Sequence, residues 1–190
     1  MRATIDVDIV ATAGTRVEYH RIGERLRKLG FRNDQTEGAP VCRWKSDEGH
    51  VIDLMPVNDE ILGFSNEWYP AAVEDPGSFD LGDSLIIHIP RPPIFLATKL
   101  AAFRNRGHGD LLLCHDLEDV ITLVAGRPEL VAEIRSEAPE VKLWIAPQIA
   151  AILDHPDFAY ALPGALPDAE RMPRYRNEVR ERFAAIAAAK

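Results

Sequence analysis

The chain has 190 residues, with 22 Lys and Arg against 30 Asp and Glu, which gives a formal net charge of −8. This length supports one well-buried core and is short for two independent ones, so we expect one domain in two lobes. The negative charge argues against broad coating of nucleic acid through neutralised phosphates, although a local basic groove is compatible with it.

The sequence also limits the compartment of the protein. Cys42 and Cys114 are far apart, and the absence of a CxxC or Cys/His cluster argues against a zinc site and a disulfide scaffold. No stretch approaches the roughly 20 apolar residues that cross a bilayer. Residues 1–6 (MRATID) lack the apolar segment of a secretory signal. We therefore expect a cytoplasmic protein with no membrane partner.

The pattern of the N-terminal part of the sequence predicts one strand, then a helix, then two further strands. Residues Ala3 to Ala11 alternate apolar and polar side chains, which is typical of a strand with one buried face. Residues 15–18 (TRVE) form a capping-box pattern, which predicts a helix that runs to Leu29 and ends at Gly30. Two further strands, Val41 to Lys45 and His50 to Met55, are separated by residues 46–49 (SDEG), a composition that favours a hairpin turn.

The rest of the chain predicts mainly helices. Residues 56–83 indicate an irregular connection with a short helical piece near Trp68 to Val73, and a strand follows at Ser84 to Ile89. Apolar stripes then predict helices at residues 94–106, 115–125, 128–137, 140–153 and 167–188. We expect an α+β (or α/β) fold: a mixed sheet with flanking helices over residues 1–90, then an all-helical region over residues 91–190 packed against it.

Three aspartates are the most informative polar residues. Asp6 and Asp8 are two apart in the first strand and therefore project from the same face. Asp53 lies in the strand His50 to Met55, and it would join them if the two strands pair. Carboxylates grouped in this way suit Mg²⁺ and phosphoryl or nucleotidyl transfer. The alternative is a solvated strand face without function, although aspartate is a poor strand former.

Several segments together resemble a known family. Residues 2–10 (RATIDVDIV), 51–55 (VIDLM), 97–100 (ATKL) and 115–119 (HDLED), with Arg106 and Asp110 between the last two, look like the AbiEii/AbiGii-toxin type of nucleotidyltransferase. These bacterial proteins belong to the DNA-polymerase-β-like superfamily. The resemblance spans about residues 1–130 in order, which makes it more specific than an isolated DxD motif.

The resemblance implies a nucleotidyltransferase-like sheet and transfer of NMP from an NTP to a hydroxyl acceptor, with Mg²⁺ or Mn²⁺ as cofactor. Asp6, Asp8 and Asp53 would be metal ligands, and Asp53 would also help to activate the acceptor. Lys99 would contact the triphosphate as a catalytic and nucleotide-binding residue. The helix alone explains Lys99 equally well as a side chain whose stem packs on apolar neighbours.

Further acidic residues follow Lys99. Asp116 suits the N-cap of the helix 115–125, and Glu118 and Asp119 would fall in its first turn, where negative charge is favoured. The resemblance implies that an acidic residue behind the lysine also faces the cleft and binds nucleotide. Asp116 and Asp119 are the leading candidates, and Asp110 is a third.

The sequence departs from the family at one point. In these proteins a helix and a Gly-Gly or Gly-Ser turn precede the strand with the two aspartates, and the turn binds the phosphates through backbone N–H groups. Here Met1 lies five residues before Asp6, and Gly14 follows the aspartates. Three explanations are open: a start assigned downstream of the true one, a protein without this phosphate cradle, or a second chain that completes the fold.

The partners are implied by the resemblance alone. They are a nucleotide, an RNA such as tRNA or a protein as acceptor, and an antitoxin or a second copy of the chain. One alternative is a catalytically degenerate binding or regulatory module, which could pair through an exposed sheet edge. Another is an HD-type metal phosphohydrolase built on His115 and Asp116, with His88, His108 and Asp154 as further ligands.

Overall fold

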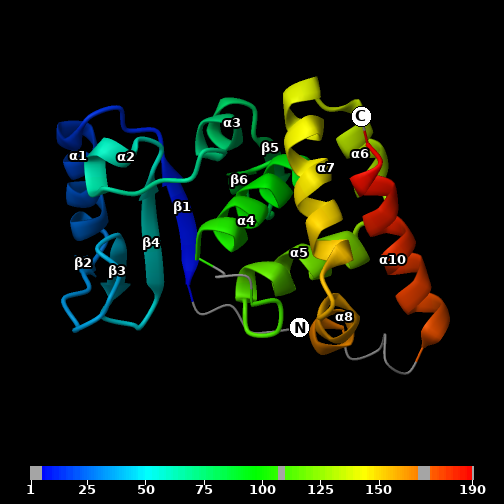
Figure 1. Ribbon diagram of the computed structural model, residues 1–190. Helices are drawn as coiled ribbons and strands as arrows, with labels where there is room; N and C mark the ends of the chain where they lie inside the picture. The colour runs from blue at the N-terminus through cyan, green and yellow to red at the C-terminus, as the bar shows by residue number, and fades with distance from the viewer. Residues whose placement is uncertain (1–5, 107–109, 167–171, 190) are drawn as a thin grey trace. The chain divides into compact units, whose positions relative to one another are not determined.

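The computed structural model describes residues 6–106, 110–166 and 172–189 (Figure 1). The chain divides into two compact units, Met1–Glu74 and Asp75–Lys190. The first contains a mixed four-stranded sheet with helices, and the second is mostly helical, so the predicted α+β fold is confirmed. None of the helices in the described ranges is long and apolar enough to cross a membrane.

The first unit is a sheet with the strand order β1-β4-β3-β2. β1 runs parallel to β4, whereas β4 and β3, and β3 and β2, are antiparallel. The first predicted strand is confirmed from Val7 onward, and its beginning at Ala3 lies outside the described residues. β2 and α2 were not predicted from the sequence. The elements are β1 (Val7–Ala11), α1 (Arg16–Lys28), β2 (Phe31–Asn33), β3 (Arg43–Ser46), β4 (Val51–Pro56), α2 (Asp59–Leu62) and α3 (Tyr69–Glu74).

Local sequence signals fix the ends of α1 and the turn between β3 and β4. Thr15 Oγ1 accepts from the Glu18 backbone N–H at 3.2 Å, and Glu18 Oε2 accepts from the Thr15 N–H at 3.1 Å, which confirms the capping box. Gly30 follows the helix with φ 87°, and Gly49 closes the predicted hairpin with φ 89°. Both glycines adopt the left-handed backbone conformation that other residues rarely take.

A small core holds the first unit together. Trp44 and Leu54 are its largest fully enclosed side chains, and Tyr19, Ile22, Phe31 and Ile52 pack against them together with buried Ala11 and Leu26. The prediction of a buried face on β1 is wrong at Val7 and Ile9, which are 59% and 39% exposed. β1 is at the edge of the sheet, whereas the core centres on β3 and β4.

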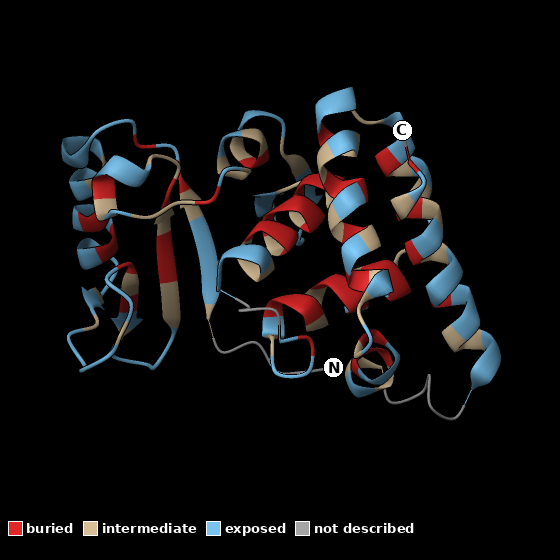
Figure 2. Cartoon of the chain, viewed as in Figure 1, coloured by how far each residue is buried: buried red, intermediate tan, exposed pale blue. Residues whose placement is uncertain are grey.

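The second unit begins with a β-hairpin, and helices follow. Figure 2 shows that buried residues concentrate on α4, α5 and α7. The predicted strand at residues 84–89 is confirmed as β6, whereas β5 and α8 were missed. The helix predicted from Pro167 is described from Pro173 onward. The elements are β5 (Gly77–Asp80), β6 (Ile86–Ile89), α4 (Pro92–Arg106), α5 (His115–Gly126), α6 (Leu130–Ser136), α7 (Pro139–Asp154), α8 (Phe158–Ala165) and α10 (Pro173–Ala187).

Hydrogen bonds and ion pairs connect elements of the second unit near the ends of its helices. Arg182 on α10 donates to the carbonyl of Ala125 at 2.6 Å, near the end of α5, where free carbonyls favour a cation. Arg91, just before α4, pairs with the buried carboxylate of Glu137 after α6 and with Asp75 at 3.1 Å. These contacts fix α5 to α10 and connect the base of the hairpin to the helices.

Gly23 on α1 lets the helix backbone lie close to Trp44 in the core of the first unit. A Cβ atom there would lie 3.0 Å from Trp44 Cζ2 and Cη2. We expect Gly23→Leu to lower the free energy of unfolding by about 2 kcal/mol, because the added side chain must displace the indole. Arg21→Leu places the same side chain on the exposed side of α1 and should change stability by less than about 0.5 kcal/mol. Urea unfolding measures both, and equal stabilities would contradict this packing.

Candidate functional site: an acidic row on the first sheet

The strand register aligns charged residues across three strands. Asp8 of β1 is opposite Asp53 of β4, and Asp53 is opposite Arg43 of β3. Residues opposite one another in adjacent strands project from the same face of the sheet. Asp6, two residues before Asp8, joins this face. The structure therefore brings the three predicted aspartates together on one face. We call the three aspartates and Arg43 the acidic row.

Arg43 lies at the centre of the acidic row. Its Nε donates to Asp53 Oδ1 at 2.8 Å, and its Nη2 donates to Asp53 Oδ2 at 2.7 Å and to Asp6 Oδ2 at 2.8 Å. The Asp53 side chain is 11% exposed, that of Arg43 is 27% exposed and that of Asp6 is 37% exposed. The hydrogen bonds to Asp53 raise the pKa of Arg43 above its ordinary value. The guanidinium therefore offsets the repulsion between the carboxylates.

Arg43 was not predicted as part of the site, because the predicted four-residue turn 46–49 would place residue 43 opposite residue 52. The Ser46 backbone N–H donates to the carbonyl of His50 at 2.9 Å, so three residues form the loop of the β3–β4 hairpin. Counting back from this pair places residue 43 opposite residue 53. A basic residue opposite an acidic one in a predicted hairpin indicates a cross-strand ion pair.

Two further titratable groups lie close to this sheet. Burial, and secondarily the negative charge of Asp53, raise the pKa of the Cys42 thiol to about 11. Burial raises the pKa of Tyr19 to about 12, and its hydroxyl donates to the carbonyl of Leu54 at 2.7 Å. Both groups are therefore protonated at neutral pH. Cys42 is a structural thiol here rather than a nucleophile, because only the thiolate attacks efficiently.

The carboxylates of the acidic row are the groups on this sheet that could hold a divalent ion. In the parts of the chain that the structure describes, no three His, Cys, Asp or Glu side chains are placed to hold one metal ion. Mg²⁺, however, commonly takes only one or two protein carboxylates and completes its shell with phosphates and water. Asp6 and the exposed Asp8 supply two such carboxylates. Asp53, the third predicted ligand, accepts hydrogen bonds from Arg43 through both of its carboxylate oxygens.

The predicted nucleotide-binding residues lie in the second unit, where they form internal ion pairs. Lys99 Nζ on α4 is 2.7 Å from Asp119 Oδ2 on α5, and it also lies 5.4 Å from the centre of the Phe95 ring. The side chain of Lys99 is 20% exposed and that of Asp119 is 35% exposed. Of the three acidic candidates, Asp119 is therefore the one that the structure pairs with Lys99.

The predicted capping role of Asp116 is wrong. Cys114 is the N-cap residue of α5 and makes no side-chain capping bond, and Asp116 lies inside the first turn. Its two carboxylate oxygens accept from Arg106 Nε and Nη2, both at 2.9 Å. Asp119 falls beyond the first turn, contrary to prediction. Asp110 closes a local turn by accepting from two backbone N–H groups, at 2.8 and 3.1 Å.

Of the residues proposed for an HD-type hydrolase, those that the structure describes form no cluster for a metal ion. His88 is exposed in β6, where its Nδ1 lies 3.4 Å from Ser78 Oγ. His115 Nδ1 lies 3.1 Å from Glu118 Oε2, and Asp116 binds Arg106. His108 lies outside the described residues. The described geometry thus offers this alternative no metal-binding cluster.

No family model matches the chain, and a search of the curated proteins also finds no match.

Arg43 gives the first test of the acidic row. We expect Arg43→Met to lower the free energy of unfolding by about 3 kcal/mol, because it leaves the carboxylate of Asp53 shielded from water without a partner. Arg32→Met is the matched control. Arg32 lies on the neighbouring strand β2 and pairs with Asp47 at 3.5 Å, and both side chains are 79% exposed. The control should cost less than about 0.5 kcal/mol. Equal losses in urea unfolding would show that Arg43 does not stabilise the sheet.

Proposed function

We propose that the chain is a metal-dependent nucleotidyltransferase that moves NMP from an NTP to a hydroxyl acceptor on RNA or protein. One observation carries the proposal: Asp8 and Asp53 are opposite one another on adjacent parallel strands, and Asp6 shares their face. The resemblance to AbiEii/AbiGii-type nucleotidyltransferases predicts aspartates at these three positions. Their grouping on one face supports that resemblance independently of sequence similarity.

The residues of the acidic row have distinct roles in this proposal. Asp6 and Asp8 would hold Mg²⁺ or Mn²⁺, which when bound supplies positive charge for the phosphates and the reacting oxygens. For Asp6 to serve in this way, its carboxylate must exchange the contact with Arg43 for the ion. Arg43 would then remain on Asp53 and fix the orientation of that side chain.

Asp53 would act on the acceptor. A carboxylate oxygen has two lone pairs, so an oxygen that binds Arg43 can still accept a hydrogen bond from a hydroxyl. The acceptor oxygen would form a bond to the α-phosphorus, the bond from that phosphorus to the pyrophosphate oxygen would break, and the hydroxyl proton would pass to Asp53. The roles predicted for Lys99, Asp116 and Asp119 rest on the resemblance.

A second candidate function is a nucleotide-binding or regulatory module without turnover. The observation that favours it is Arg43 itself, which engages both oxygens of Asp53 and one oxygen of Asp6. An arginine can replace the charge of a metal ion but cannot perform its Lewis-acid chemistry. Transfer activity therefore separates the two functions, whereas nucleotide binding is common to both.

Calorimetry of the full chain with each NTP, with and without Mg²⁺, tests the proposal. We expect metal-dependent binding that is lost in the Asp6→Asn/Asp8→Asn variant, because the two carboxylates that hold the ion become neutral amides. Asp47→Asn is the matched control; Asp47 is an exposed aspartate of the same unit, and its loss should leave binding unchanged.

The same variants separate catalysis from binding. With labelled NTP and a pool of cellular RNA and protein, the wild-type chain should transfer label and Asp6→Asn should not, while its circular dichroism stays that of the wild type. Binding without transfer in the wild type would support the regulatory module. Transfer by Asp6→Asn at the wild-type rate would refute the assignment of Asp6.

A further inference from the structure

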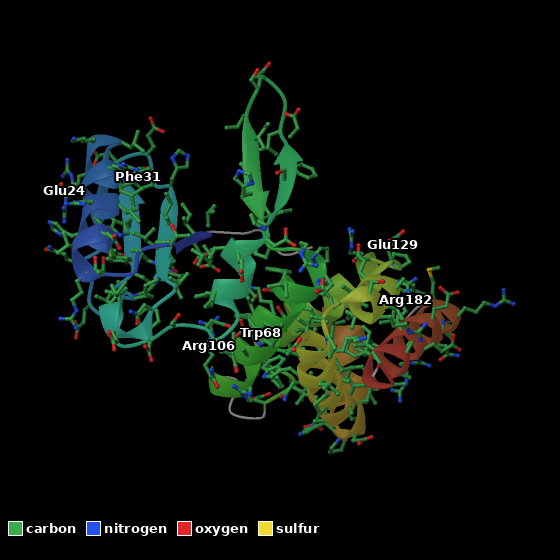
Figure 3. All side chains as sticks on the ribbon, turned by 90° about the horizontal axis from the view of Figure 1, so that it is seen from above. Glu24, Phe31, Trp68, Arg106, Glu129 and Arg182 are labelled. Atoms are coloured by element: carbon green, nitrogen blue, oxygen red, sulfur yellow. The ribbon has the colours of Figure 1, made fainter. Side chains whose placement is uncertain are left out.

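Lys45 is a basic residue on the same face of the sheet as the acidic row. It lies two residues after Arg43 in β3, so both side chains project from one face. The neighbouring Trp44 projects from the other face, where it forms the core with residues of α1. Figure 3 shows α1, which carries the labelled Glu24, on that side of the sheet. Lys45 therefore belongs to the face opposite α1.

Asp34 fixes the position of the Lys45 ammonium. The Asp34 N–H donates to the carbonyl of Arg43 at 2.9 Å, which places Asp34 beside β3, directly after β2. Its Oδ2 lies 2.7 Å from Lys45 Nζ, and its Oδ1 accepts from the Thr36 backbone N–H at 3.1 Å. The Asp34 side chain is 5% exposed, and the hydrogen bond from Lys45 lowers the pKa of this carboxyl to about 2. Asp34 is therefore charged at neutral pH, and Lys45 keeps a fixed counter-charge.

The ammonium of Lys45 can bind a second acceptor while it stays on Asp34. An ammonium carries three N–H donors, and one of them suffices for the Asp34 oxygen. The Lys45 side chain is 47% exposed, which leaves room for an anion at the other donors. Arg43 differs, because its guanidinium already binds three carboxylate oxygens of the acidic row. Lys45 is thus a cation that can take an added anion without giving up its own ion pair.

Lys45 lies within reach of an anion that is bound at the β1 edge of the sheet. β4 separates β3 from β1, so the backbones of β3 and β1 are roughly 10 Å apart. Arg43 spans this gap, since its Nη2 lies 2.8 Å from Asp6 Oδ2. Lys45 is opposite Val51 of β4, which adds no competing charge. A ligand that extends from Asp6 across Val51 would therefore meet the ammonium of Lys45.

We propose that Lys45 binds the outer phosphates of the NTP, the β- and γ-phosphates, and so makes the site prefer triphosphates to monophosphates. The proposal rests on the proposed nucleotidyltransferase function, in which the ion at Asp6 and Asp8 binds the phosphate chain. An NTP carries more negative charge than one divalent ion offsets, so a further cation beside the ion is favourable. Lysine suits this role, since its compact ammonium binds phosphate as a point charge.

The position of Lys45 keeps the outer phosphates apart from the acceptor. Asp53, which would act on the acceptor, is opposite Arg43, whereas Lys45 is opposite Val51. These two levels are roughly 7 Å apart, because each residue advances a strand by roughly 3.4 Å. The reacting α-phosphate and the outer phosphates can therefore use separate parts of one face. A monophosphate lacks the groups that would reach Lys45, so its binding should not depend on this residue.

Calorimetry of the full chain with Mg²⁺ and each of the four common NTPs and NMPs tests the proposal. Lys45→Met removes the charge and keeps an apolar stem of similar length. It should weaken NTP binding about tenfold and change NMP binding less than about twofold, because one charge-assisted hydrogen bond is lost from the triphosphate alone. Lys28→Met is the matched control: Lys28 is an exposed lysine of α1, on the other side of the sheet, and its loss should change neither affinity.

Two further variants separate the charge of Lys45 from its effect on folding. Because Lys45→Met leaves Asp34 without its cation, the double variant Lys45→Met/Asp34→Asn removes both charges and keeps an oxygen for the Thr36 N–H. It should lose NTP affinity like Lys45→Met, while its circular dichroism stays that of the wild type. Lys45→Arg keeps the charge and should retain most of the affinity for NTP.

The outcomes separate this inference from the function on which it rests. A wild-type chain that binds no NTP in the presence of Mg²⁺ would overturn both. Metal-dependent NTP binding that is unchanged in Lys45→Met, or that Lys45→Met and Lys28→Met weaken equally, would overturn only the role of Lys45. Equal losses of NTP and NMP affinity in Lys45→Met would do the same, because the contact would then not lie at the outer phosphates.

Discussion

The ion pair between Arg43 and Asp53 is the constraint on which the first unit depends. Three carboxylates on one face of a small sheet repel one another, and aspartate itself disfavours strands. Arg43 offsets both costs through two hydrogen bonds to Asp53 and one to Asp6. It does so only in one register, since a slip of one residue would turn the guanidinium to the other face. The charges therefore help to select the strand alignment.

This arrangement explains why local rules are broken at these positions. Sequences that fold well follow strand preferences, and exceptions concentrate where another requirement competes. Asp8 and Asp53 are such exceptions on two adjacent strands, Asp6 directly precedes β1, and an arginine on a third strand binds Asp53 and Asp6. The two candidate functions differ in what this compensation means. For a nucleotidyltransferase, Arg43 orients Asp53 and releases Asp6 to the metal, whereas for a binding module it replaces the metal.

Much of the fold could be predicted because its signals are local. The capping box at Thr15, the glycine at Gly30 and the turn at Gly49 each act within a few residues, and all three are observed. The alternation of Asp6 and Asp8 gave their common face. The place of Arg43 could not be predicted in the same way, because the predicted four-residue turn puts residue 43 opposite residue 52, whereas the observed three-residue loop puts it opposite Asp53.

The failed predictions depended on contacts between distant residues. Asp116 has the sequence context of a cap, but Arg106 from the preceding helix binds it inside the first turn. Val7 and Ile9 alternate with polar residues, which is typical of a strand with one buried face. Both side chains are nevertheless exposed, because β1 is an edge strand that the core does not cover. No pattern of neighbours in the sequence shows which strand lies at the edge of a sheet.

The most direct test of the central claim is to locate a bound metal ion at the acidic row by NMR. Mn²⁺ broadens the amide signals of nearby residues, and excess Mg²⁺ restores them if the two ions share a site. We predict that the first signals to broaden are those of Val7, Ile9, Ile52 and Leu54, which flank Asp8 and Asp53. Broadening that begins around Asp34 and Asp47, or that Mg²⁺ does not reverse, would contradict a metal site on this face.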